Sequence, residues 1–176
     1  PWFRKHLIPA GGQEVLNQAD LLILCGEVPA SWTDRIRAFL RNGGRVLVLE
    51  TKQSLRFLTP ALRVKWLLNE WSQEKFPMRS NTFFADHGHP LFIGLEWTDL
   101  CYWGNLRKKR LDPPVERVFA PAGLGRKVTT LATAGLGDAV MAEFHAGKGR
   151  GLATTVKLLD RFRTHPVAGL LLRRMV

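Results

Sequence analysis

Residues 19–50 carry the pattern of a strand, a helix and a second strand, which together make one βαβ unit. LLILC (Leu21 to Cys25) is a continuous apolar run, which is typical of a strand buried on both faces. Ile36, Phe39 and Leu40 share one face of the helix that follows, and RVLVLE is the second strand. Because a crossover of this kind is right-handed and joins parallel strands, the unit predicts an α/β sheet with a parallel core.

The ends of the helix in this unit are marked by two polar or glycine-rich sequences. Ser31 can accept hydrogen bonds from the first exposed amides, and Asp34 follows three residues on. The sequence Asn42-Gly43-Gly44 stops the helix, because glycine adopts the left-handed conformation found after a helix end. We therefore expect the helix to begin at Ser31 and to end at Asn42.

The second half of the chain is richer in strand patterns than the first. Four short β candidates follow the Pro113-Pro114 loop: VERVFAP, KVTTLATA, AVMAEFHA and GLATTVKL. GKGRG (residues 147–151) reads as a hairpin turn between the last two rather than as a phosphate loop. A final helix is expected from about Pro166, and 61–71 has helical spacing. This order predicts a three-layer α/β domain with antiparallel strands added to the sheet.

Length and composition fit one globular domain. A chain of 176 residues with 45% hydrophobic content can bury a sizeable core. No apolar run approaches the roughly 20 residues that a membrane span needs. The chain starts at Pro1 and ends inside an apolar and basic pattern, so we expect a single domain over 1–176 that is a piece of a larger protein. Localisation is left open, and a preceding part would carry any signal for a secreted or periplasmic location.

The formal net charge of +11 is concentrated toward the C-terminus, where residues 107–176 carry fourteen Lys and Arg against five Asp and Glu. The densest cluster is Arg107, Lys108, Lys109 and Arg110, beside a Pro-Pro turn. Such a cluster suits a solvated loop or an anion-binding surface for anionic glycan. Charge alone supplies only non-specific affinity, so nucleic acid is not the expected partner.

Metal and disulfide chemistry have little support in the sequence. His87 and His89 have a spacing that places two rings on one face of an extended segment, but a third ligand is not evident. The two cysteines, Cys25 and Cys101, make neither a disulfide framework nor a zinc site, and each reads as a buried small side chain. Whether these two pair with each other stays open. No cofactor is expected.

Carboxylates and aromatic side chains supply the remaining candidates. Glu27 and Glu50 follow the two strands of the βαβ unit, at the sheet edge where α/β proteins bind ligands. Glu96 and Asp99 lie beside aromatic residues, and paired carboxylates of this kind serve sugar hydrolysis when they flank the glycosidic bond. The neighbouring aromatic side chains suit an interface with another domain or a glycan contact. They are Trp97, Tyr102 and Trp103.

Three sequence segments resemble a known family when they are taken together in this order. They are the βαβ sequence DLLILCGEVPASWTDRIRAFLRNGGRVLVLE, the run HPLFIGL followed by DL and YW, and AGKGR followed by TTVKL and HPVA with LLL. This order resembles the class I glutamine amidotransferase-like domain attached to bacterial glycoside hydrolases, especially β-galactosidase-like proteins. The resemblance covers the chain from about Ala19 to its end.

The resemblance implies a flavodoxin-like fold that packs beside a catalytic domain or forms oligomers. A working amidotransferase carries a cysteine on the elbow after its third strand, where this chain has Glu50-Thr51-Lys52, and Cys25 lies on the preceding strand. The resemblance therefore implies a non-catalytic domain whose partners are other domains of the same polypeptide, a second copy, or carbohydrate. Two alternatives remain open: a sugar hydrolase using the carboxylates, and a basic module that binds anionic glycan or nucleic acid.

Overall fold

The computed structural model describes residues 16, 19–25, 28, 30–49, 66–67, 82–84, 86–101, 103–105, 110–112, 118–119, 128–134 and 137–176. The helical elements are the 3-10 turns η2 (Ala30–Trp32), η5 (Pro90–Phe92) and η6 (Trp97–Leu100), and the α-helices α2 (Thr33–Arg41) and α4 (Pro166–Met175). The strands are β1 (Leu21–Cys25), β2 (Arg45–Leu49), β3 (Trp66–Leu67), β4 (Thr82–Phe84), β5 (Trp103–Asn105), β6 (Arg110–Asp112), β7 (Val118–Phe119), β8 (Val128–Ala134), β9 (Asp138–Ala146) and β10 (Gly149–Thr154).

The described strands form one mixed sheet of eight strands and a separate two-stranded hairpin of β5 and β6. The main path is β1-β2-β10-β9-β7-β3, and β8 joins it by pairing with both β9 and β4. β2 pairs in parallel with β1 on one side and with β10 on the other. β10 is antiparallel to β9, and β8 is antiparallel to β9 and β4. The predicted parallel core with antiparallel additions is therefore confirmed.

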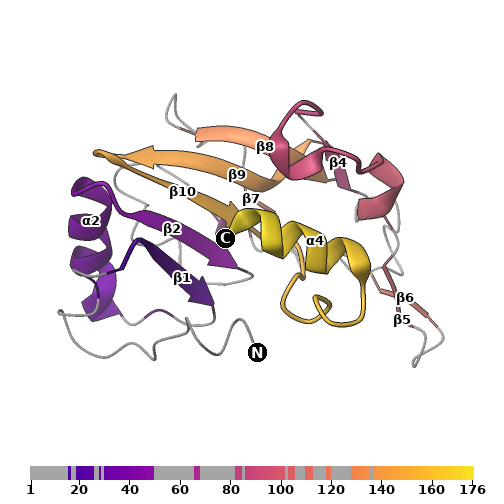
Figure 1. Cartoon of the computed structure of the whole chain (residues 1–176), viewed down its shortest axis with the longest axis horizontal. Coiled ribbons are helices and arrows are strands. Elements are labelled where there is room, and N and C mark those ends of the chain that lie inside the picture. The colour runs from indigo at the N-terminus through magenta and orange to yellow at the C-terminus, as the bar shows by residue number, and fades with distance from the viewer. Residues whose placement is uncertain are drawn as a thin grey trace.

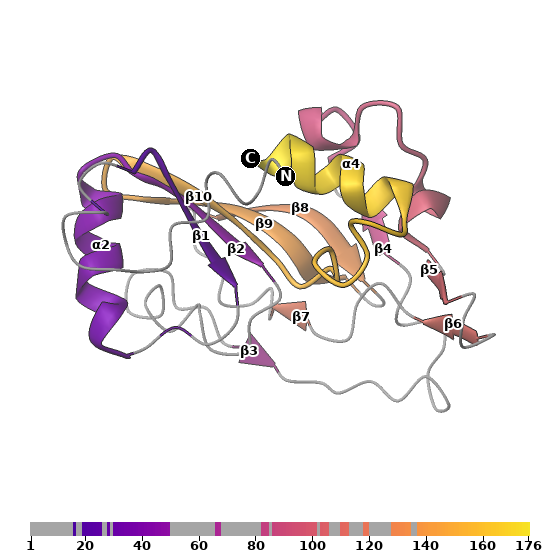
Figure 2. The same ribbon diagram turned by 60° about the horizontal axis from the view of Figure 1, so that its bottom comes forward.

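Helices cover both faces of this sheet, which makes three layers (Figures 1 and 2). Successive strand residues point to opposite faces, so one strand supplies both layers. Val46 and Val48 of β2 belong to a core cluster that contains α2 residues. Leu47 and Leu49 belong to a second cluster that contains α4 residues. The flavodoxin-like α/β architecture thus has a separate hydrophobic core under each helix.

The first strand of the βαβ unit is less buried than its apolar sequence predicts. Leu24 is buried, but Leu21 to Ile23 are half-buried and Cys25 is exposed. The reason is topological, because β1 is the outermost strand on its side of the described sheet and pairs there with β2 alone. Cys25 is therefore not the buried side chain expected, and it forms no disulfide with the buried Cys101.

The helix of the βαβ unit ends as predicted but begins differently. The N-H groups of Gly44 and Gly43 donate to the carbonyls of Phe39 and Leu40 at 3.0 and 3.1 Å, and Gly43 has a φ of 101°. This double hydrogen bond is the Schellman motif that ends many helices. At the other end the predicted Ser31 cap is wrong. The turn η2 precedes α2, so the capping position falls on Trp32, which makes no side-chain cap bond.

The later strands and the final helix agree well with the sequence patterns. β8, β9 and β10 fall on three of the predicted β segments, a two-residue turn joins β9 to β10, and α4 starts at Pro166. The expected helix over 61–71 is wrong at Trp66–Leu67, which pairs with β7 as a short strand. Tertiary pairing here outweighs local helical spacing. Within the described part of the chain, no helix is both long and apolar enough to cross a membrane.

Candidate functional site

The carboxyl ends of the parallel strands, where the sequence predicts a site, are only partly described. Cys25 ends β1 and is exposed, and Leu49 ends β2 and is buried. The candidate carboxylates Glu27 and Glu50 lie outside the described residues. Their proposed catalytic role stays a prediction.

The second carboxylate pair holds a turn of the backbone together. Asp99 Oδ2 accepts a hydrogen bond from the Glu96 N-H at 2.8 Å, which fixes the start of η6. The carbonyl oxygen of Asp99 accepts a hydrogen bond from Trp103 Nε1, also at 2.8 Å. The observed contacts of Asp99 are thus those of a helix cap. A role of Glu96 and Asp99 in sugar hydrolysis stays a prediction.

The three aromatic candidates have different environments. Trp97 is 47% exposed, whereas Trp103 is only 1% exposed and belongs to the core on the α4 side. The ring of Trp103 stacks on His165 with centroids 4.7 Å apart. Tyr102 lies outside the described residues. Of the described pair, Trp97 is the side chain that solvent or a partner can reach.

The histidine pair makes local contacts rather than a common cluster. His89 Nδ1 accepts a hydrogen bond from the Leu91 N-H at 3.3 Å, and His89 Nε2 lies 3.4 Å from Glu143 Oε1. A neutral imidazole with its proton on Nε2 satisfies both contacts. His87 is exposed and meets the Phe84 ring edge-on at 5.5 Å. Among the described residues, no three metal-ligating side chains gather into one group.

The basic cluster of the sequence is largely undescribed. Arg107, Lys108 and Lys109 lie outside the described residues, and the backbone of Arg110 begins β6. Its predicted anion-binding role therefore stays a prediction.

Two titratable side chains near η6 and α4 have shifted pKa values. Burial raises the pKa of the Cys101 thiol, although its hydrogen bond to the Thr82 carbonyl acts the other way. Burial, with help from the nearby charge of Arg161, lowers the pKa of His165, and Asp99 opposes that shift. Cys101 is consequently a protonated, poorly nucleophilic thiol at neutral pH, and His165 is a neutral ring.

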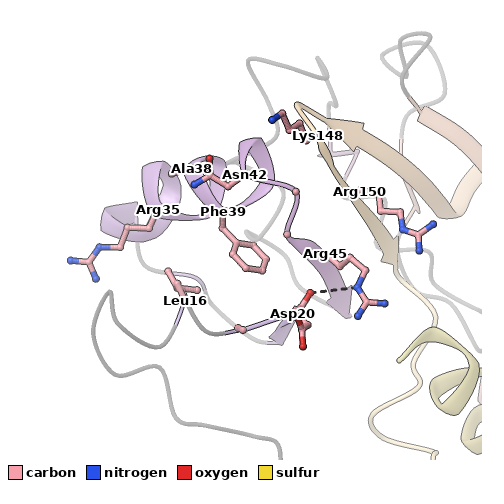
Figure 3. A pocket seen from close by; sticks show the side chains of 12 residues that line it. Leu16, Asp20, Arg35, Ala38, Phe39, Asn42, Arg45, Lys148 and Arg150 are labelled. Carbon is pink, nitrogen blue, oxygen red and sulfur yellow. Dashed lines mark hydrogen bonds between the residues drawn. The ribbon is translucent and has the colours of Figure 1, made fainter.

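Positively charged side chains line a groove at the end of the sheet opposite the carboxyl ends of the parallel strands (Figure 3). We call it the basic groove; it lies at the amino ends of the parallel strands and has a volume of about 610 Å³. Its lining residues are Leu16, Ala19, Asp20, Arg35, Ala38, Phe39, Asn42, Gly43, Gly44, Arg45, Lys148 and Arg150. Four of these are cationic and one is anionic, so the groove is strongly positive.

Sequence reasoning missed this groove because its cations come from three separate segments. Arg35 is on α2, Arg45 begins β2, and Lys148 and Arg150 flank a glycine after β9. The signal in the sequence is that both glycine-rich turns, Asn42-Gly-Gly-Arg45 and Gly147-Lys-Gly-Arg150, end in an arginine within the first two residues of a strand.

Sequence comparison finds no relative, and structure comparison finds the fold. No family model matches the chain, and no curated protein matches it either. A cytoplasmic protein of Salmonella typhimurium, STM3548, matches with a TM-score of 0.61 and 11% identity, over 96% of this chain and 74% of that one. A ThuA-like protein of Bacteroides uniformis matches with a TM-score of 0.60 and 12% identity, over 93% and 70%.

A third match is to part of a much longer enzyme. The exo-β-1,4-mannosidase Op5Man5 of Opitutaceae bacterium strain TAV5 matches with a TM-score of 0.50 and 12% identity. The match covers 89% of this chain but 25% of the mannosidase. At identities this low the three matches show the fold alone, which is an α/β flavodoxin-like fold that the ThuA-like neighbour shares.

Proposed function

We propose that this chain is a non-catalytic, amidotransferase-like domain of a larger carbohydrate-active protein, and that it serves domain packing or oligomerisation. The observation that carries the proposal is a pair of exposed apolar side chains on an ordered platform. Ile93 is 61% exposed and Trp97 is 47% exposed, and both lie in the segment that runs from η5 to η6. Exposed apolar side chains that lie together on a surface mark sites of interaction with a partner.

The platform that presents these two side chains is held from several directions. Leu91 and Phe92, just before Ile93, are buried against the α4 side of the sheet. Arg174 Nη1 of α4 donates to the Leu91 carbonyl at 2.8 Å. The Glu96 and Asp99 cap fixes the backbone next to Trp97. A fixed backbone lowers the entropy cost of binding a partner, as a packing surface requires.

The comparisons support the setting of this proposal. The fold recurs as about a quarter of a mannosidase chain, so it exists as one part of a larger carbohydrate-active enzyme. The exposed Trp also fits the enrichment of aromatic side chains in protein interfaces. Its four-residue separation from Ile93 keeps both side chains in one short segment.

The test compares the whole gene product with the isolated 176-residue chain. Hydroxyl-radical footprinting should find Trp97 oxidised more slowly in the whole product, and Ile93→Ser with Trp97→Ser should weaken its assembly in sedimentation velocity. Arg163→Ser, at an exposed residue of the loop before α4, is the control and should change neither. Equal oxidation of Trp97 in both samples would contradict the proposal.

Activity gives a second and independent readout of the same proposal. The isolated chain should release no product from aryl β-mannosides, other aryl glycosides or glutamine. Turnover that disappears on a single substitution, such as Glu50→Gln or Asp99→Asn, would replace the packing proposal with the hydrolase alternative.

A further inference from the structure

The basic groove contains a pair of arginines that the sheet places side by side. Arg45 and Arg150 are register partners on the parallel strands β2 and β10, so their side chains leave the same face of the sheet. Figure 3 shows both side chains extending to the same side, away from α2. Neighbouring strands lie about 4.8 Å apart, and like charges at partner positions repel.

Nothing described in the protein neutralises this pair. Both arginines are exposed, and within the described part of the chain neither makes an ion pair with a carboxylate. Arg45 Nε donates instead to the backbone carbonyl of Asp20 at 3.4 Å, which orients its guanidinium. On the other side of Arg150, the register partner is the exposed His145 of β9. An oxyanion between the guanidinium groups would relieve their repulsion.

The turn between β9 and β10 is built to keep these cations at the groove. Gly147 has a φ of 66°, and a Cβ there would lie 2.7 Å from the Cα of Arg41 at the end of α2. A Cβ on Gly149 would collide with the Leu40 carbonyl. The two glycines therefore let the turn rest directly on the end of α2. Lys148 and Arg150, which alternate with these glycines, consequently lie at the rim of the basic groove.

The rest of the groove suits a ring with hydroxyl groups. Phe39 of α2 is half-buried and lines the part of the groove next to Leu16 (Figure 3). The exposed Asp20 and Asn42 side chains offer acceptors and donors for hydroxyl groups. The volume of about 610 Å³ falls within the range of small-molecule sites, about 300–1,000 Å³.

We propose that the basic groove binds a small saccharide that carries one oxyanion, namely a phosphate, sulfate or carboxylate group. The guanidinium groups of Arg45 and Arg150 hold the oxyanion, Lys148 adds charge at the rim, and the hydroxyl groups of the sugar meet Asp20 beside Arg45. The volume of about 610 Å³ suits one small ligand rather than a nucleic-acid strand. This site is independent of the packing surface at Ile93 and Trp97, so either proposal can fail alone.

Calorimetry at constant ionic strength tests the site with defined probes. The probes are inorganic phosphate, inorganic sulfate, glucose, glucose 6-phosphate, glucose 6-sulfate and glucuronate. At least one charged sugar should bind tenfold or more tightly than glucose and than either inorganic ion. The probe that binds best identifies the oxyanion. Equal affinity for the inorganic ions and the charged sugars would overturn the saccharide assignment.

Matched variants separate binding from folding. Arg150→Thr and Arg45→Thr should each weaken the best charged sugar by tenfold or more, Arg150→Lys should weaken it less, and Arg163→Thr should leave it unchanged. Because each threonine variant removes one of two repelling charges, each should also melt at a slightly higher temperature without ligand. Charged sugar should then raise the melting temperature of the native chain and not that of the threonine variants.

Two outcomes of these measurements would overturn the proposal. One is unchanged affinity in both threonine variants. The other is a single-stranded oligonucleotide that binds more tightly than every sugar and loses its affinity in Arg150→Thr, because that would make the groove a nucleic-acid site.

Discussion

The η5–η6 and α4 region and the basic groove use polar side chains in opposite ways. Around α4, the polar groups hold the backbone. Asp99 caps η6 and its carbonyl oxygen accepts a hydrogen bond from Trp103 Nε1, and Arg174 donates a hydrogen bond to the Leu91 carbonyl. At the groove, Arg45, Lys148 and Arg150 stand exposed around a cavity. Candidate residues are therefore better judged by the hydrogen bonds and ion pairs that they already make within the protein than by their chemical type. A carboxylate in use as a cap is less available than an arginine that faces solvent.

The largest expected effect tests the structural side of this comparison. Trp103→Ala removes a side chain that is 1% exposed, together with its hydrogen bond to Asp99 and its stack on His165. We expect a loss of about 3–5 kcal/mol in the free energy of unfolding, measured by urea denaturation. Trp97→Ala, at 47% exposure, should lose clearly less, about 1–2 kcal/mol. Similar losses for the two variants would break the distinction between core and surface tryptophan.

The next effect tests whether the groove turn is constrained by close packing. Gly147→Ala places a Cβ 2.7 Å from Arg41 at a φ of 66°, and we expect it to cost about 2–4 kcal/mol of unfolding free energy. Gly94→Ala is the matched control, because Gly94 has a φ of 72° with no atom within 4 Å of the added Cβ. That variant should lose about 1–2 kcal/mol from backbone conformation alone. Equal losses would mean that the turn does not press on α2.

The smallest expected effect concerns the pH dependence of the α4 region. Burial lowers the pKa of His165, so the unfolded chain binds its proton more readily than the folded one. The contribution of neutral His165 to the free energy of unfolding is therefore fully present above pH about 6.5. It declines as the pH falls through the lowered pKa of the folded state. His165→Phe keeps an aromatic ring for Trp103 and should flatten that decline in unfolding measurements between neutral and acidic pH.

A second substitution sharpens the pH prediction. The charge of Arg161 helps to lower the pKa of His165, so Arg161→Gln should reduce the same decline without abolishing it. An undiminished decline in His165→Phe would assign the pH dependence to another group.

Much of the fold could be predicted from local pattern, and little of the site could. The apolar runs at β2, the glycines after α2 and the proline that opens α4 each act through neighbours a few residues away. The sequence could not show that β1 lies at the sheet edge, that Trp66 pairs with β7, or that Trp103 is core while Trp97 is surface. Those outcomes depend on which segments, distant in the sequence, pack against these residues in the fold.

By itself the sequence determined the βαβ unit, the β9–β10 hairpin, the final helix and an excess of positive charge. These follow from backbone preferences and apolar periodicity, which are short-range properties. Only the tertiary structure decided that Arg45 and Arg150 stand next to each other, because 104 residues of chain lie between these two register partners. It also brought Asp99 and His165 into contact with Trp103. The sequence gives the number and order of the charged residues, but strand pairing sets the distance between them.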